Sequence, residues 1–286
     1  MNAVIRDRYK GPEMARVMSF VMAVFILVPV IAPSIGQVIL IFFNWEAIFW
    51  MFLITALLVC IWFSVRLDET LLPKSRQPLS FRKIRNGMIE VLKTRTALGY
   101  TLATGFLFSP FVGYLSSSQQ IFADGYGKKD EFPLLFASLA LTFGVASLVN
   151  ARLVYRYGLK RLCFASVSVI TGLSGIFLLG ILGMDKMPPL WLFMGYMMII
   201  FPGIGFLFGN LNALAMEPLG HIAGVGAAMI GSLSSLISIP LGILIAGAFN
   251  GTVLPLVTGF SLCGFAVLFS IIWTEKNPQS KVVVEN

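Results

Sequence analysis

The stretch 66–95, RLDETLLPKSRQPLSFRKIRNGMIEVLKTR, decides the organisation of this chain because it is the only long polar segment in it. It carries eight Lys and Arg residues against three Asp and Glu residues. Two long apolar runs precede it and six follow it. A basic segment between blocks of apolar runs is typical of a cytoplasmic connector between two groups of membrane helices.

Composition indicates an all-α polytopic membrane protein. The 286 residues are 57% hydrophobic and 12% charged, whereas soluble domains carry about a quarter charged residues. The apolar residues come in blocks of about 20, the length that a helix needs to cross the hydrocarbon core. The basic residues that give the net charge of +8 lie between these blocks. They therefore indicate the topology of the chain and a lipid bilayer as its partner, rather than nucleic acid.

Eight membrane helices are predicted from the apolar runs. They are expected at residues 17–42, 47–65, 97–119, 133–153, 162–182, 189–211, 223–248 and 253–273. A short amphipathic helix on the membrane surface is expected over residues 80–93, where Phe81, Ile84, Met88 and Leu92 have helical spacing.

The basic residues predict the orientation. One face is assigned residues 1–16, 66–95, 152–161 and the C-terminal tail. That face then holds all of the 21 Lys and Arg residues except Lys128, Lys129 and Lys186. Basic loops stay in the cytoplasm, so both termini are expected to be cytoplasmic.

Polarity sorts the helices into two groups. Those at 47–65, 162–182 and 253–273 are mainly apolar, while the other five carry prolines, glycines, hydroxyls or amides. Polar atoms are costly against lipid, so the second group should surround a cavity. The candidate cavity residues are Met22, Phe25, Thr101, Thr104, Asn210, Ser232 and Ser235.

Two alternatives remain open for these candidates. Flexible Met and aromatic groups such as Met22 and Phe25 suit varied apolar ligands, but core or lipid contact is the favoured explanation of them. Ser232, Ser235 and Ser238 recur every three residues and could line a substrate path. Small residues also simply allow close helix packing.

The first helix should be bent. Pro29 and Pro33 each lack a backbone donor, so two hydrogen bonds of the helix are lost on one face. Gly36 leaves room for a close helix contact.

No catalytic, metal or cofactor site is predicted. Cys60, Cys163 and Cys263 form no metal-ligand pair, and His221 is the only histidine, without an acidic partner at triad spacing. The carboxylates nearest the apolar runs, Glu46 and Glu217, sit at the edges of predicted helices. The chain is therefore not expected to be an enzyme.

Several short segments resemble the major facilitator superfamily, in particular its Bcr/CflA drug-resistance branch. Residues 32–36, Ala-Pro-Ser-Ile-Gly, resemble the antiporter motif G-x-x-x-G-P-x-x-G-G of the fifth helix, with Val28, Ala32 and Gln37 in place of glycines. Residues 119–122 with 126–127 resemble the first outer loop of the C-terminal half, and residues 212–218 with 224–231 the segment from helix ten to helix eleven.

A cytoplasmic loop motif of the same superfamily, D-R-x-G-R-R, is similar to residues 156–161. Its candidate residues here are Arg156, Gly158, Lys160 and Arg161. Tyr155 stands where the acid of the motif would be, so a salt bridge from that acid is not expected.

The resemblance implies a partial fold of this superfamily. The spans would be family helices five to twelve, and helices one to four would be missing. Residues 1–65 would then be the end of the N-terminal half, 66–95 a cytoplasmic loop and 96–286 the C-terminal six-helix half. The resemblance also implies that Pro29, Pro33 and Gly36 control leak and favour antiport, although a packing kink is an equal alternative.

The function that the resemblance implies is proton-driven efflux of small drug-like or amphipathic compounds across a bacterial inner membrane. Protons and a small-molecule substrate are its implied partners. Because such a cavity is built from both halves, this chain alone is not expected to export drugs. The alternative is a stable membrane fragment that does not transport and serves as an interaction partner.

Overall fold

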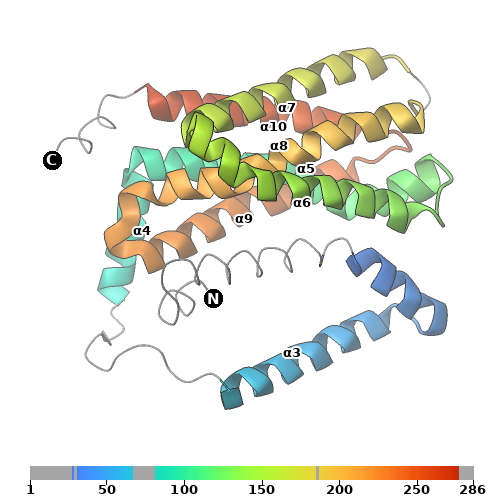
Figure 1. Ribbon diagram of the computed structural model, residues 1–286, viewed down its shortest axis with the longest axis horizontal. Helices are drawn as coiled ribbons and strands as arrows, with labels where there is room; N and C mark the ends of the chain where they lie inside the picture. Colours follow the sequence, from blue (N-terminus) through green and yellow to red (C-terminus); the bar gives the residue numbers. More distant parts are fainter. Residues whose placement is uncertain (1–27, 29–30, 67–80, 185–186, 277–286) are drawn as a thin grey trace. The chain divides into compact units, whose positions relative to one another are not determined.

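A computed structural model describes residues 28, 31–66, 81–184 and 187–276 (Figure 1). Every regular element in these ranges is a helix, which confirms the all-α class. The bounds are Ile31–Phe42 for the first apolar helix, then α3 Glu46–Arg66, α4 Phe81–Lys93, α5 Arg95–Gln120, α6 Phe132–Tyr157, α7 Leu159–Ile181, α8 Leu190–Met216, α9 Ala223–Gly247 and α10 Leu254–Glu275. A π-helical turn, η2 Ile121–Gly125, follows α5, and a 3-10 helix, η3 Glu217–Ile222, joins α8 to α9.

Each predicted helix has an observed counterpart where the structure describes the chain, and the bounds differ by up to five residues, most at the ends of α6 and α8. Six segments of the described chain are long and apolar enough to cross a membrane, and one of these, Leu190–Gly247, contains both α8 and α9. The helix predicted over 80–93 is α4. The helix predicted over 17–42 is described from Ile31 to Phe42, and its earlier part lies almost wholly outside the described residues.

The chain divides into two compact units. The first consists of Met1–Leu79 with Phe136–Leu141, and the second of Ser80–Leu135 with Thr142–Asn286. In the first unit a tight turn separates the Ile31–Phe42 helix from α3, and in it the Ala47 amide donates to the Asn44 carbonyl at 3.0 Å. Glu46 begins α3 and Arg66 ends it, which suits the helix dipole at both ends.

The second unit is built around α5. This helix packs most extensively against α9, and then against α10 and α8, while α7 contacts both α8 and α10 (Figure 1). Large side chains such as Tyr100, Tyr114 and Leu107 of α5 are almost fully buried in this bundle. This helix, one of the five that were expected to surround a cavity, is therefore the core of the unit.

Small residues allow α5 and α9 to approach closely. On α5, Gly105, Ser109 and Gly113 follow one another at four-residue spacing, so they share one face. A Cβ atom on Gly105 would lie 2.9 Å from the Ile237 Cβ, and one on Gly113 would lie 2.8 Å from the Ile245 Cγ2. Neither position has room for a side chain.

The facing residues of α9 follow the same spacing. Ser234 and Ser238 are buried, and a Cβ atom on Gly242 would lie 2.6 Å from the Val112 Cγ1 and 2.9 Å from the Ser109 carbonyl oxygen. Close helix packing thus explains these small residues of the 223–248 segment, as membrane helix interfaces commonly require.

Candidate functional site

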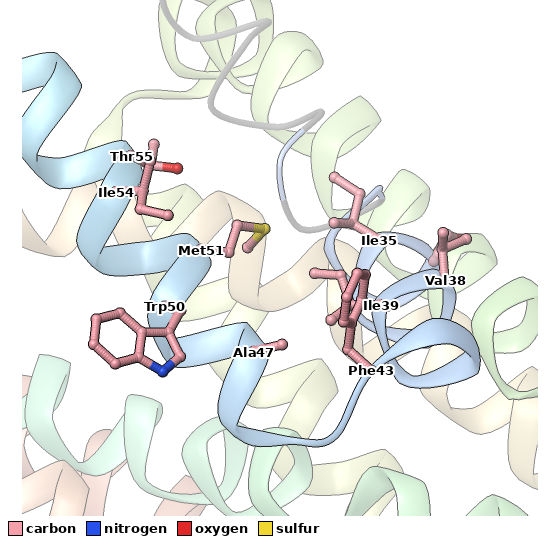
Figure 2. Close-up of a pocket in the computed structure, with 10 residues that line it drawn as sticks. Ile35, Val38, Ile39, Phe43, Ala47, Trp50, Met51, Ile54 and Thr55 are labelled. Carbon is pink, nitrogen blue, oxygen red and sulfur yellow. The ribbon is translucent and has the colours of Figure 1, made fainter.

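An apolar groove opens in the first unit between the Ile31–Phe42 helix and α3. Its volume is about 690 Å³. Figure 2 shows Ala47 and Met51 of α3 pointing toward Ile39 and Phe43 across this groove. The full lining is Ser34, Ile35, Val38, Ile39, Phe43, Ala47, Trp50, Met51, Ile54 and Thr55. Only two hydroxyls and one indole N–H in this lining are polar, so the groove suits apolar groups.

Two of the three antiporter-motif candidates, Pro33 and Gly36, lie on the Ile31–Phe42 helix. Pro33 is half-buried. Gly36 lines, with Ala32, a second groove of about 310 Å³ against Ile48 and Met51 of α3. A Cβ atom on Gly36 would meet no described atom within 4 Å, so the close contact expected at Gly36 is absent from the described part of the chain. Pro29, Met22 and Phe25 lie outside the described residues.

Thr101 and Thr104 lie inside the second unit rather than on an open surface. They are 0% and 4% exposed. Their hydroxyls donate to carbonyls one turn earlier, Thr101 to Ala97 at 2.6 Å and Thr104 to Tyr100 at 2.8 Å. The Ser234 hydroxyl of α9 donates to the Thr101 carbonyl at 3.2 Å. Both hydroxyls are thus satisfied inside the second unit, and Thr101 lies where α5 meets α9.

Asn210 is paired with a residue that was not among the candidates. Its Nδ2 donates to Asn150 Oδ1, and the Asn150 Nδ2 donates to Asn210 Oδ1, both at 2.9 Å. Asn210 is 3% exposed and Asn150 is half-buried. Each amide uses one of its two donor hydrogens in this pair, so both keep a hydrogen for a further partner. The sequence feature that could have identified Asn150 is its side-chain amide, which stands inside the apolar run 133–153.

Ser232 and Ser235 are exposed on α9, unlike Ser234 and Ser238. Ser232 lies beside a groove of about 350 Å³ between α4 and α9. The groove is lined by Ile84, Met88, Gly224, Val225, Ala228, Met229 and Ser232. The two exposed serines are thus open to a neighbour or ligand.

The loop motif joins α6 to α7. Gly158 ends α6 with a φ of +79°, a conformation that favours glycine, and its amide donates to the Val154 carbonyl at 2.8 Å. Arg156 and Arg161 are exposed, and the Arg156 guanidinium lies 5.4 Å from the centre of the Tyr157 ring. The glycine of the motif therefore has a clear structural role in the turn.

Lys160 of the motif has an acidic partner that the sequence did not reveal. Its Nζ lies 2.9 Å from Glu275 Oε2, and the Tyr100 hydroxyl donates to Glu275 Oε1 at 2.5 Å. The carboxylate at the end of α10 thus connects the starts of α5 and α7. Lys160 and Glu275 are 115 positions apart, which explains why no local pattern predicted the pair.

Two further contacts hold helix ends together in the second unit. The Arg95 guanidinium donates to the Trp273 carbonyl and lies 4.5 Å from the centre of the Trp273 ring. His221 Nε2 and Glu90 Oε1 are 2.6 Å apart, and this pair joins η3 to α4. Within the described ranges, no three His, Cys, Asp or Glu residues form a group that could hold a metal ion.

Comparison with known proteins gives consistent matches. The family model described as Major Facilitator Superfamily matches residues 1–243. The bicyclomycin resistance protein homolog of Haemophilus influenzae is 27% identical over 288 residues, which cover 98% of this chain and 70% of the relative.

Two other relatives extend this picture. The uncharacterized MFS-type transporter YdgK of Bacillus subtilis is 29% identical over 239 residues, 82% of this chain and 58% of the relative. The multidrug resistance protein MdtL of Shewanella sp. (strain ANA-3) is 24% identical over 253 residues, 87% of this chain and 62% of the relative. The chain thus spans between 58% and 70% of the length of these three relatives. The matches confirm the resemblance to the drug-resistance branch.

Proposed function

We propose, from the premise that this chain belongs to the major facilitator superfamily, that it takes part in proton-driven efflux of small drug-like or amphipathic compounds. The observation that carries the proposal is the match to the family model over residues 1–243, together with relatives named for bicyclomycin and multidrug resistance. The apolar groove between the Ile31–Phe42 helix and α3 supports it, because apolar walls with few polar groups suit such compounds.

The transport cycle would be alternating access, with the substrate near the middle of the bilayer between two halves. Tight packing of α5 against α9 would let the second unit move as one body. The residues that we propose for the pathway are Thr101, Thr104, Asn210, Ser232 and Ser235. Of these, the two serines are open to a substrate as described, and Asn210 would reach one by opening its pair with Asn150.

Proton coupling requires a carboxylate within reach of the pathway. The described acids lie at helix ends, in turns or in α4: Glu46, Glu90, Asp124, Asp130, Glu131, Glu217 and Glu275. We therefore place the main coupling acid outside the described residues. The proposed location is a bacterial inner membrane with both termini cytoplasmic, as the distribution of basic residues predicts.

Dye accumulation in an efflux-deficient bacterium tests the function. One strain produces the 286-residue chain, and a second produces this chain fused to the part of the Haemophilus influenzae relative that lies outside the match. The fusion should lower dye accumulation in a manner that an uncoupler abolishes, and the chain alone should not. A well-produced fusion that leaves dye accumulation at the empty-vector level would count against efflux.

A second candidate is a membrane protein that does not transport and binds another chain. It is favoured by α3, in which no residue is buried. Efflux from the fusion would decide against this second candidate, and efflux from the chain alone would show that further helices are not needed.

A further inference from the structure

The amphipathic helix α4 is held in a fixed orientation on the second unit. Val91 is fully buried, and Gly87 faces α9 so closely that a Cβ atom on it would lie 2.9 Å from the Val225 Cγ1. The Glu90–His221 pair fixes the same helix to η3. The remaining faces of α4 therefore point in defined directions.

Beside the buried face runs an apolar strip that is exposed. Phe81 is 90% exposed, Met88 40% and Leu92 44%. These residues are seven and four positions apart, so they lie on one side of the helix. An exposed phenylalanine followed by two further apolar side chains needs an apolar neighbour.

A basic strip follows directly around the helix. Arg82, Arg85 and Lys93 are exposed, and with Ile89 they occupy positions i, i+3, i+7 and i+11 of one face. At 100° per residue, Arg85 is the residue next to Leu92 around the helix. The one acid of α4, Glu90, is already engaged with His221. Going around α4, the face that contacts α9 is followed by the apolar strip, and the apolar strip is followed by the basic strip.

We infer that this surface of α4 binds anionic phospholipid. A helix with apolar and cationic strips side by side lies in the membrane interface, with its apolar groups toward the acyl chains and its cations at the depth of the phosphates. The aliphatic stems of arginine and lysine can cover apolar surface while their charges reach the headgroups.

The position of α4 in the fold favours lipid over other anionic partners. It packs against α9 and α5, both of which are in membrane-spanning segments. Met88 of the apolar strip also lines the groove between α4 and α9. The apolar surface of α4 is therefore continuous with a membrane-spanning helix, so an acyl chain can extend along α9 while the headgroup stays at the arginines.

The test places a bimane fluorophore on α4 of the whole chain. Ile89→Cys puts it in the basic strip, and Cys60→Ser with Cys263→Ser removes the other accessible thiols, since Cys163 is buried. The protein is reconstituted in vesicles of phosphatidylcholine and phosphatidylglycerol. A nitroxide quencher is carried near the headgroup of either the anionic or the zwitterionic lipid, with the total lipid composition unchanged.

Quenching should be stronger from the nitroxide on phosphatidylglycerol, because each arginine near an anionic surface favours association by about fivefold. Arg82→Gln with Arg85→Gln should make the two quenchers equal, whereas Arg82→Lys with Arg85→Lys should keep the preference. Arg152→Gln with Arg156→Gln, which removes the same charge from the α6 end, should also keep it.

Three results would overturn the inference. Equal quenching by the two lipids before any arginine is replaced would show no anionic preference. A preference that survives Arg82→Gln with Arg85→Gln would place the anionic site elsewhere. The third result is that neither lipid quenches the fluorophore although the helix content and the size-exclusion elution of the protein are unchanged. It would mean that protein rather than lipid covers the strip.

Discussion

Replacing Gly242 by alanine should weaken the packing of α5 against α9. The new Cβ atom would lie 2.6 Å from the Val112 Cγ1, 2.7 Å from the Val112 Cβ and 2.9 Å from the Ser109 carbonyl oxygen. A rotamer change moves only the first of these atoms, because the Val112 Cβ and the Ser109 carbonyl belong to the α5 backbone region. Ordinary contact begins at 3.4 Å, so the helices must separate by about 0.7 Å locally.

Overpacking of this kind typically costs about 1–3 kcal/mol. For a chain of this size we expect the Tm of this variant to lie about 2–12 °C below that of a Gly→Ala control without the clash. With Cys60→Ser and Cys263→Ser removing the more accessible thiols, the assay follows the buried Cys163 thiol, 1% exposed, with a dye that fluoresces on reaction during a temperature ramp in detergent. Release of this thiol reports opening of the second unit.

Gly231→Ala is the matched control. It lies on the same helix, and a Cβ atom there would meet nothing within 4 Å. Both substitutions gain the same helix propensity, about 1 kcal/mol, so the difference between their Tm values isolates the contact with α5. Equal Tm values for the two variants would refute the close-packing argument.

Three further predictions concern other parts of the chain. Asn150→Ala, Asn210→Ala and the double variant should show a coupling free energy of about 0.6–1.7 kcal/mol in the same thermal assay; additive effects would mean that the amide pair does not form. In the active fusion, Pro33→Ala should restore a backbone donor and reduce substrate efflux at equal expression, and unchanged efflux would leave only the packing explanation of the motif. Ser80→Cys, at a position outside the described residues and with Cys60→Ser, should resist an impermeant thiol reagent in intact cells, whereas labelling from outside would reverse the proposed orientation.

The sequence predicts the helices well because hydrophobic block length is a local property. The bounds of α3 and α9 differ from the predicted ones by one residue at most, and α4 agrees equally well. The charged contacts could not be predicted in the same way. Glu275 with Lys160 and Glu90 with His221 join residues 115 and 131 positions apart, and only the packed bundle brings them together.

The faces of the helices were harder to predict than their bounds. Three-residue spacing grouped Ser232, Ser235 and Ser238, but the face of α9 that packs on α5 follows four-residue spacing through Ser234, Ser238 and Gly242. Which side of an apolar helix meets protein depends on where its neighbours lie, and hydropathy carries little of that information. The same reason explains why Thr101 and Thr104, polar in sequence, are buried inside the bundle.

Proton-driven movement of a drug-like cation into vesicles tests the central claim most directly. The fusion is reconstituted in proteoliposomes with an acidic lumen, and a fluorescent cationic dye is added outside. If the protein exchanges lumenal protons for dye, the dye should accumulate inside while the pH gradient lasts. A protonophore should abolish this accumulation. Accumulation that is the same with and without the gradient, or equal to that of empty vesicles, would contradict proton-driven efflux by this protein.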